Sequence, residues 1–142
     1  MNRTFRTAVC AFAAAGLAFG LTACSEAQKV ADGAVDKAVN EKYDVTYEVT
    51  GNGVDEIQFN GGGGKSATDP KIEKITKPEL PWKKTVTLRG IEPPTVLPIA
   101  ADIKGTDVTC KITYKGKVIK EASGEGVISG GGCVAVSPIV EQ

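Results

Sequence analysis

Residues 107–121 read DVTCKITYKGKVIKE, and this stretch decides the fold. Every second residue from Val108 to Tyr114 is apolar, which is the period of a half-buried β-strand. Lys115 and Gly116 then predict a two-residue turn, because glycine adopts the positive φ that such turns require. The stretch is therefore expected to form a β-hairpin whose first strand has one face in the core.

The two-residue turn also predicts which residues face each other across the hairpin. It sets Ile112 opposite Ile119 on the apolar face and Lys111 opposite Lys120 on the other face. Like charges directly opposite each other are unfavourable, so the lysine face is expected to lie in solvent. Lys111, Lys117 and Lys120 are the residues predicted to contact an acidic partner; a solvated face without a function is the alternative.

Composition favours short strands and turns in a single domain. The chain has 142 residues, glycine is abundant at 17 residues, and aromatic residues make up only 6%. There is no histidine, which removes the commonest general base and the commonest metal ligand. The formal net charge is zero, so no bulk attraction to nucleic acid is indicated. We expect no enzyme activity, no catalytic residue, no cofactor and no metal.

The N-terminus has the features of a cleaved lipoprotein signal, residues 1–23. Arg3 and Arg6 precede an apolar, alanine-rich stretch that is too short to span a bilayer comfortably. The stretch ends in LTAC, residues 21–24, which resembles the bacterial lipobox. In lipoproteins with this motif the cysteine carries a diacylglyceryl group and becomes the mature N-terminus. Cys24 is therefore the predicted lipidation site, with an ordinary signal and a chance cysteine as the alternative.

The cysteines can then be assigned one by one. Cys10 leaves with the signal and Cys24 carries lipid, so Cys110 and Cys133 remain in an oxidising compartment. Two thiols without histidine make a poor zinc site. A disulfide between Cys110 and Cys133 is the prediction, and two buried free thiols are the alternative.

Residues 24–42 are expected to tether the domain to the membrane. Apolar residues recur at helical spacing from Ala27 to Val39. A helix this short is marginal alone, and Gly33 in its middle weakens it further. The tether is therefore predicted to be either a short helix or a flexible segment.

Residues 43–142 are expected to form the folded domain. Alternating or apolar runs bounded by turn residues predict strands over 43–49, 54–59, 82–88, 95–103, the two arms of 107–121, and 133–136, with a weaker strand at 72–75. About seven strands with turns this frequent predict an all-β, immunoglobulin-like β-sandwich.

One motif resembles a phosphate-binding P-loop but does not satisfy it. The sequence GGGGKS, residues 61–66, lacks the first glycine of the motif, because Phe59 occupies that position. Asp69 and Pro70 follow closely, so no helix is expected after it. A flexible glycine loop is the prediction.

Several segments together resemble the MmpS family, the small mycobacterial membrane proteins. They are YEVTG at 47–51, LPW at 80–82 leading into TVT at 85–87, CKIT at 110–113, and Cys133 near the end. The resemblance covers roughly residues 43–140. It implies an extracytoplasmic β-sandwich with a disulfide and a role beside MmpL-type transporters, which export lipids or siderophores. Family members usually keep an uncleaved transmembrane helix, and here a lipobox replaces it.

Two functions follow as hypotheses. The first is a lipid-anchored accessory protein on the extracytoplasmic face of the cell membrane, which supports an MmpL-type transporter. The second is a free-standing lipoprotein that binds a small apolar ligand. A pocket large enough for a lipid tail would favour the second.

Overall fold

The computed structural model describes residues 33, 35, 36, 39–65, 68–102, 104, 106–124, 127 and 131–140. The chain divides into two compact units, residues 1–37 and residues 38–142. The predicted signal peptide and Cys24 lie outside the described residues. Within the predicted tether, the described residues 33, 35, 36, 39 and 40 have helical backbone. Among the described residues, no helix has the length and apolar character needed to cross a membrane.

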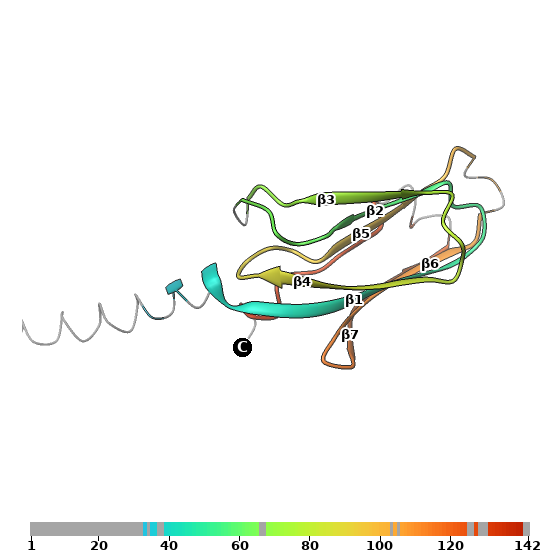
Figure 1. Ribbon diagram of the computed structural model, residues 1–142. Helices are drawn as coiled ribbons and strands as arrows, with labels where there is room; N and C mark the ends of the chain where they lie inside the picture. Colours follow the sequence, from blue (N-terminus) through green and yellow to red (C-terminus); the bar gives the residue numbers. More distant parts are fainter. Residues whose placement is uncertain are drawn as a thin grey trace, which may run out of the picture. The chain divides into compact units, whose positions relative to one another are not determined.

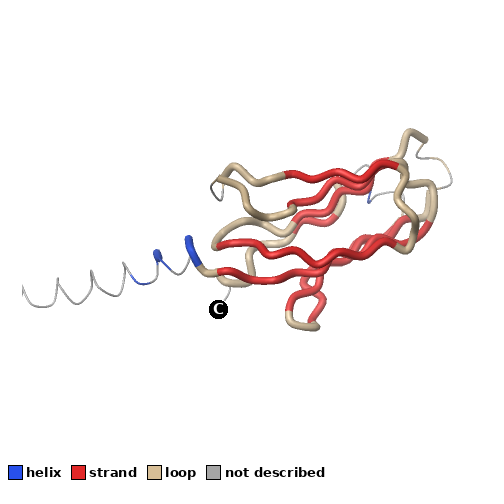
Figure 2. Tube along the Cα trace, viewed as in Figure 1, coloured by secondary structure: helices blue, strands red, loops and turns tan. Residues whose placement is uncertain are grey.

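The second unit is an antiparallel β-sandwich of two four-stranded sheets (Figures 1 and 2). The strands are β1 (Lys42–Gly51), β2 (Glu56–Asn60), β3 (Ile72–Thr76), β4 (Trp82–Arg89), β5 (Thr95–Ile99), β6 (Val108–Tyr114), β7 (Lys117–Ser123) and β8 (Cys133–Val134). One sheet has the order β4-β1-β6-β7 and the other β3-β2-β5-β8. The predicted all-β sandwich is confirmed, and the weak strand expected at 72–75 forms β3.

The likeness to an immunoglobulin domain lies in the two layers. The hairpins β2–β3 and β6–β7 lie in opposite sheets, and every other connection between consecutive strands crosses from one sheet to the other. The constant-type immunoglobulin domain orders its strands ABED and CFG, so the strand order here is a different one.

The core lies between the sheets and is filled by the side chains that alternate with polar neighbours. Its buried apolar residues are Tyr43, Val45, Tyr47, Val49, Ile57, Phe59, Val86, Leu88, Val96, Val108, Cys110, Ile112, Val127, Cys133 and Ile139. Val108, Cys110 and Ile112 are all at most 1% exposed, as the alternation in the hairpin predicts. Trp82 covers one side of this core, with its ring centroid 5.2 Å from that of Phe59.

Two strands end earlier than predicted, and hydrogen bonding gives the reason. β5 ends at Ile99 because the next backbone donors bond to side chains: the Ala101 N–H donates to Asp55 Oδ2 at 2.7 Å. β8 has two residues rather than four. The Ala135 N–H donates to the Pro94 carbonyl, and because Pro94 has no N–H the ladder stops there.

The hairpin turn is confirmed, but the predicted register is wrong. Lys115 and Gly116 have φ of 46° and 79°, the two positive values of a type I′ turn. A β-bulge then shifts the pairing by one residue between Ile112 and Thr113. Lys111 therefore faces Glu121 rather than Lys120, and Ile112 faces Lys120 rather than Ile119. Bulges are common on edge strands such as β7, where an extra residue disturbs only one neighbour.

The glycine loop after β2 packs against the edge of the other sheet. Gly62 is buried with φ of 75°, and its N–H donates to Asn60 Oδ1 at 3.1 Å. A Cβ at this position would overlap the Thr87 carbonyl oxygen of β4. Glycine is therefore required here by both backbone conformation and space.

Candidate functional site

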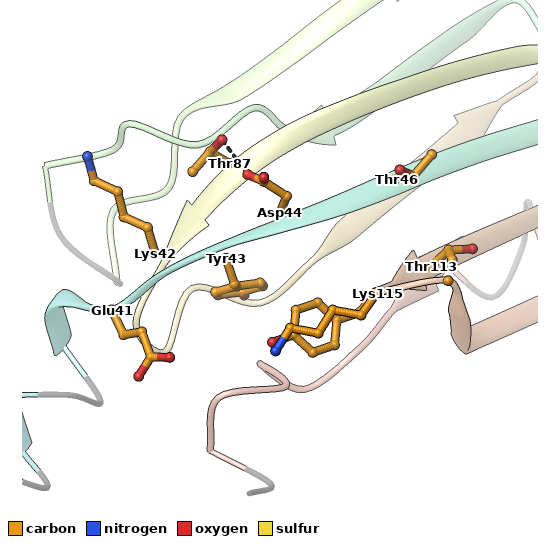
Figure 3. A pocket seen from close by; sticks show the side chains of 10 residues that line it. Glu41, Lys42, Tyr43, Asp44, Thr46, Thr87, Thr113 and Lys115 are labelled. Carbon is orange, nitrogen blue, oxygen red and sulfur yellow. Dashed lines mark hydrogen bonds between the residues drawn. The ribbon is translucent and has the colours of Figure 1, made fainter.

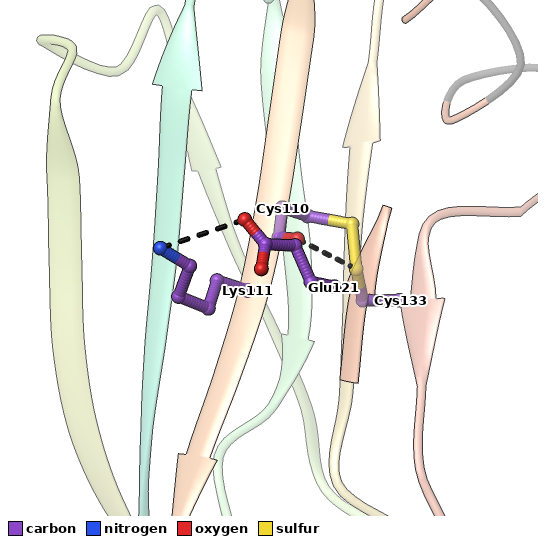
Figure 4. Close-up of a disulfide and its surroundings, with 4 residues drawn as sticks. All are labelled: Cys110, Lys111, Glu121 and Cys133. Atoms are coloured by element: carbon purple, nitrogen blue, oxygen red, sulfur yellow. Dashed lines mark hydrogen bonds and ion pairs between the residues drawn. A yellow bond between two sulfur atoms is a disulfide. The ribbon is translucent and has the colours of Figure 1, made fainter. Parts of the chain in front are cut away.

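The predicted disulfide is confirmed and joins the two sheets (Figure 4). Cys110 on β6 and Cys133 on β8 are bonded with an S–S distance of 2.05 Å and a Cα–Cα distance of 6.0 Å. Both residues are fully buried, and Cys133 Sγ lies 3.0 Å from the Cys110 carbonyl oxygen. The bond therefore holds the short edge strand β8 against the opposite sheet from inside the core.

The three hairpin lysines that were predicted to contact a partner, Lys111, Lys117 and Lys120, do not share one face. Residues directly opposite each other in an antiparallel ladder lie on the same face. Lys120 faces the buried Ile112, and Lys117 faces Tyr114, so both stand on the inward side at the edge of the sheet and are exposed. Lys111 is on the outward side, where its Nζ lies 3.6 Å from Glu121 Oε1 (Figure 4). The bulge thus separates Lys120 from Lys111, and Lys117 lies opposite Tyr114 already in the register that the turn sets.

The outward side of the sheet β4-β1-β6-β7 is polar and largely paired within itself. Glu48 on β1 has Lys83 opposite it on one side and Lys111 on the other, and Lys111 in turn faces Glu121. Charge therefore alternates across all four strands, with ion pairs of 3.7 Å at Lys83–Glu48 and 3.6 Å at Lys111–Glu121. This row of alternating charges accounts for a lysine at position 111 without a contact to a partner protein, because opposite charges across strands stabilise their pairing.

An open groove of about 700 Å³ lies at one end of this sheet (Figure 3). It is lined by residues 41–44 and Thr46 at the start of β1, by Thr87 of β4, and by residues 113–116 at the hairpin turn. The Tyr43 and Tyr114 rings meet edge to face at 6.1 Å, and Lys115 Nζ lies 5.0 Å from the Tyr114 ring centre. The groove thus combines lysines, carboxylates, hydroxyl groups and an aromatic ring, so it can bind polar groups of either charge.

A buried polar network supports the base of the groove. The Tyr43 hydroxyl donates to the Glu92 carbonyl oxygen, and burial raises the pKa of Tyr43 to about 12. The Glu92 side chain is 1% exposed, and its Oε2 accepts the Arg89 N–H at 2.9 Å. Glu92 Oε1 has no hydrogen-bond partner among the described residues. Glu92 thereby holds the turn between β4 and β5.

An apolar pocket on the other sheet is small. It has a volume of about 110 Å³ and is lined by Gln58, Phe59, Ile72, Thr95 and Leu97. Ligand pockets usually measure roughly 300–1,000 Å³, so this one is too small for a lipid tail.

Neither the groove nor Glu92 was predicted from the sequence. Tyr43 and Tyr114 lie in alternating apolar runs, so they are predicted only as core residues. Their meeting depends on the pairing of β1 with β6, which joins segments far apart in the chain. In the sequence Glu92 looks like an ordinary surface acid after a turn. The only feature that points to a special position is its place between Gly90 and Pro93.

The fold and this site define a small all-β domain whose two sheets are joined by a buried disulfide. The chain belongs to the family described as Mycobacterium membrane protein, whose family model matches residues 8–137. This confirms the resemblance to the MmpS family, and the family's description associates its members with the membrane. A comparison with curated proteins finds no match.

Proposed function

We propose that this chain is a lipid-anchored accessory protein on the extracytoplasmic face of the cell membrane, which supports an MmpL-type transporter of the RND class in exporting lipids or siderophores. Family membership over residues 8–137 carries the proposal, because the resemblance to MmpS implies this role. The lipobox at residues 21–24 supports the anchor, and the buried disulfide suits an oxidising compartment outside the cytoplasm.

The proposed contact is the exposed part of the β6–β7 hairpin. Its tip projects from the body of the sandwich (Figure 1). Lys117 and Lys120 are exposed there, and Val118 between them is 43% exposed. Lys111 is a weaker candidate, since its ion pair with Glu121 already neutralises it. An anchored protein needs only a weak contact, because confinement to the membrane raises its effective concentration beside the transporter.

The alternative, a lipoprotein that binds an apolar ligand, has less support. Its expected pocket is an apolar cavity between the sheets, and the apolar pocket formed by described residues is about 110 Å³. The larger groove is open and lined by charged and hydroxyl side chains.

Charge reversal on the hairpin tests the proposed contact. Lys117→Glu with Lys120→Glu should leave the fold intact, because solvated charges contribute little to stability. The variant should recover several-fold less transporter than the wild type when the full chain is purified from membranes. The loss should be larger at low salt, where screening is weakest. Lys74→Glu with Lys104→Glu is the matched control, since both are exposed lysines outside the hairpin.

Two results would contradict the proposal at different levels. Wild-type recovery of the transporter with the hairpin variant would place the contact elsewhere on the domain. Crosslinking in cells that captures no transporter with the wild-type chain would reject the accessory role itself.

A further inference from the structure

One pair of residues breaks the charge pattern of the polar sheet face. Lys42 at the start of β1 lies directly opposite Arg89 at the end of β4. It is the only like-charged pair in the ladder between these two strands, where Glu48 faces Lys83 and the remaining outward pairs involve threonine. Like charges directly opposite each other destabilise a sheet. A local rule broken in this way commonly marks a functional position.

The two cations are not neutralised within the described part of the chain. No ion pair there joins Lys42 or Arg89 to a carboxylate. Glu92 accepts only the backbone N–H of Arg89, and its second oxygen has no hydrogen-bond partner among the described residues. Asp44 is the next acid on this face, and it accepts a hydrogen bond from Thr87 at 2.6 Å. The pair therefore leaves two positive charges side by side.

Both cations line a hollow that a glycine loop completes. The hollow has a volume of about 340 Å³ and is lined by Lys42, Gly63, Gly64, Thr87, Leu88 and Arg89. Gly62 anchors this loop against Thr87, while a Cβ on Gly63 would meet open space. In Figure 3 the Lys42 side chain extends away from the Tyr43 ring. The glycine backbone carries no side chain that would block an approaching oxyanion, and its N–H groups can donate hydrogen bonds to one. Beside two cations it is therefore a suitable surface for an oxyanion.

We propose that Lys42, Arg89 and the backbone of Gly63 and Gly64 form a binding site for a phosphate group. The anion would relieve the repulsion between the two cations, and Arg89 can hold two phosphate oxygens at once through its planar guanidinium group. Acidic residues outnumber basic ones over residues 24–70, so the net charge of this segment would repel an anion. The attraction for the phosphate group would therefore come from the two cations at the site itself. Lys42 is the last residue of the predicted tether, so a membrane phospholipid is one source of the phosphate and a soluble phosphate compound is the other. The site does not depend on the proposed function.

Titration of the full chain in dodecyl maltoside micelles tests the site. Inorganic phosphate is added in one arm, and phosphatidylglycerol or phosphatidylcholine is mixed into the micelles in the others. The amide resonances of Gly63 and Gly64 should shift and saturate. Lys42→Gln and Arg89→Gln should each weaken the apparent affinity about tenfold, the loss of a hydrogen bond to a charged group. Without ligand, neither change should lower the melting temperature, because each removes a repulsion.

Lys83→Gln is the matched control, since Lys83 lies on the same face and strand but is paired with Glu48. It should leave the affinity unchanged. Saturation by inorganic phosphate assigns the site to soluble phosphate compounds, and saturation with phosphatidylglycerol or phosphatidylcholine but not with inorganic phosphate assigns it to a lipid headgroup. The proposal fails if none of the three probes gives a saturable shift, or if Lys83→Gln weakens binding as much as the other two changes.

Discussion

Tyr43 and Tyr47 carry polar groups into the core, and each hydroxyl is satisfied there. The Tyr47 hydroxyl donates to the Asn60 carbonyl at 3.0 Å and accepts the Thr95 N–H at 3.3 Å. The Tyr43 hydroxyl donates to the Glu92 carbonyl. These three bonds run from β1 to Asn60 and Thr95 in the other sheet and to Glu92 in the turn that leads into it. A buried tyrosine is tolerated when its hydroxyl finds such partners, so these two residues join the layers as well as fill the core.

Alkaline pH should weaken the fold through these tyrosines. Burial raises the pKa of Tyr43 to about 12 and that of Tyr47 further. The folded-state pKa lies above the unfolded value near 10, so the stabilisation is complete below about pH 10 and is lost as the pH rises through about 12. For Tyr43 we expect a loss of about 2 kcal/mol, measured by chemical denaturation between pH 8 and 12.

Tyr43→Phe separates the two contributions of this hydroxyl. At pH 8 it should cost about 1 kcal/mol through the lost hydrogen bond, and between pH 10 and 12 it should flatten the decline. Tyr114→Phe, at a half-exposed ring, is the control and should keep the decline. An equal slope in wild type and Tyr43→Phe would contradict the assignment.

Single residues were predictable where one face of a strand meets the core. Val108, Cys110 and Ile112 are buried as their alternation predicts, because a strand turns successive side chains to opposite faces. Glu92 was not predictable, since its burial depends on the Arg89 N–H that it caps and on Tyr43 from another strand. The alternation of apolar and polar residues along a strand predicts which face each side chain lies on. It does not predict which residue from a distant segment will contact that side chain.

At the scale of elements, the strands were predictable and their pairing was not. The turn at Lys115 and Gly116 follows from local chemistry, and it is present. The bulge between Ile112 and Thr113 leaves no signature in the local sequence, yet it moves Lys120 to the other face from Lys111. Because the side-chain period of a strand is two, one inserted residue exchanges the faces of every residue beyond it. The bulge separates Lys120 from Lys111 in this way, whereas Lys117, which lies before the bulge, already faces Tyr114 in the register that the turn sets.

The disulfide links elements that have little else to hold them together. β8 pairs with β5 through two residues only, and the bond to Cys110 on β6 attaches it covalently to the opposite sheet. Cys110→Ala with Cys133→Ala should lower the free energy of unfolding by about 2–5 kcal/mol, as for native disulfides in small secreted domains. Replacing both residues avoids leaving a reactive thiol. Urea denaturation of the variant, beside wild type with and without reductant, measures the effect.

The reduced wild type is the internal control for the cavity that two alanines create. It should lose stability by a similar amount while keeping both sulfur atoms. A loss below about 1 kcal/mol in both samples would mean that packing, rather than the covalent bond, holds β8 in place.

At the scale of the whole molecule, the binding surfaces arise from pairings between distant segments. The phosphate site needs Lys42 opposite Arg89 and the glycine loop beside both, which only the register of β1 with β4 provides. The glycine run was correctly excluded as a P-loop on its sequence, since that motif requires a following helix. Its proximity to two cations could not be read from spacing along the chain.

The lipid anchor should determine where the molecule resides, and it can be separated from the fold. Residues 38–142 form a compact unit of their own, so changes in residues 1–37 should leave the sandwich folded. Cys24→Ala should abolish incorporation of a fatty-acid probe, because it removes the thiol that is predicted to carry the diacylglyceryl group. Without acyl chains the protein should also shift out of the mature, anchored form. Cys10→Ala is the matched control, since Cys10 lies in the predicted signal and should leave labelling intact. Undiminished label on Cys24→Ala would reject the lipobox, and label lost only from Cys10→Ala would place the acyl group upstream of the predicted cleavage site.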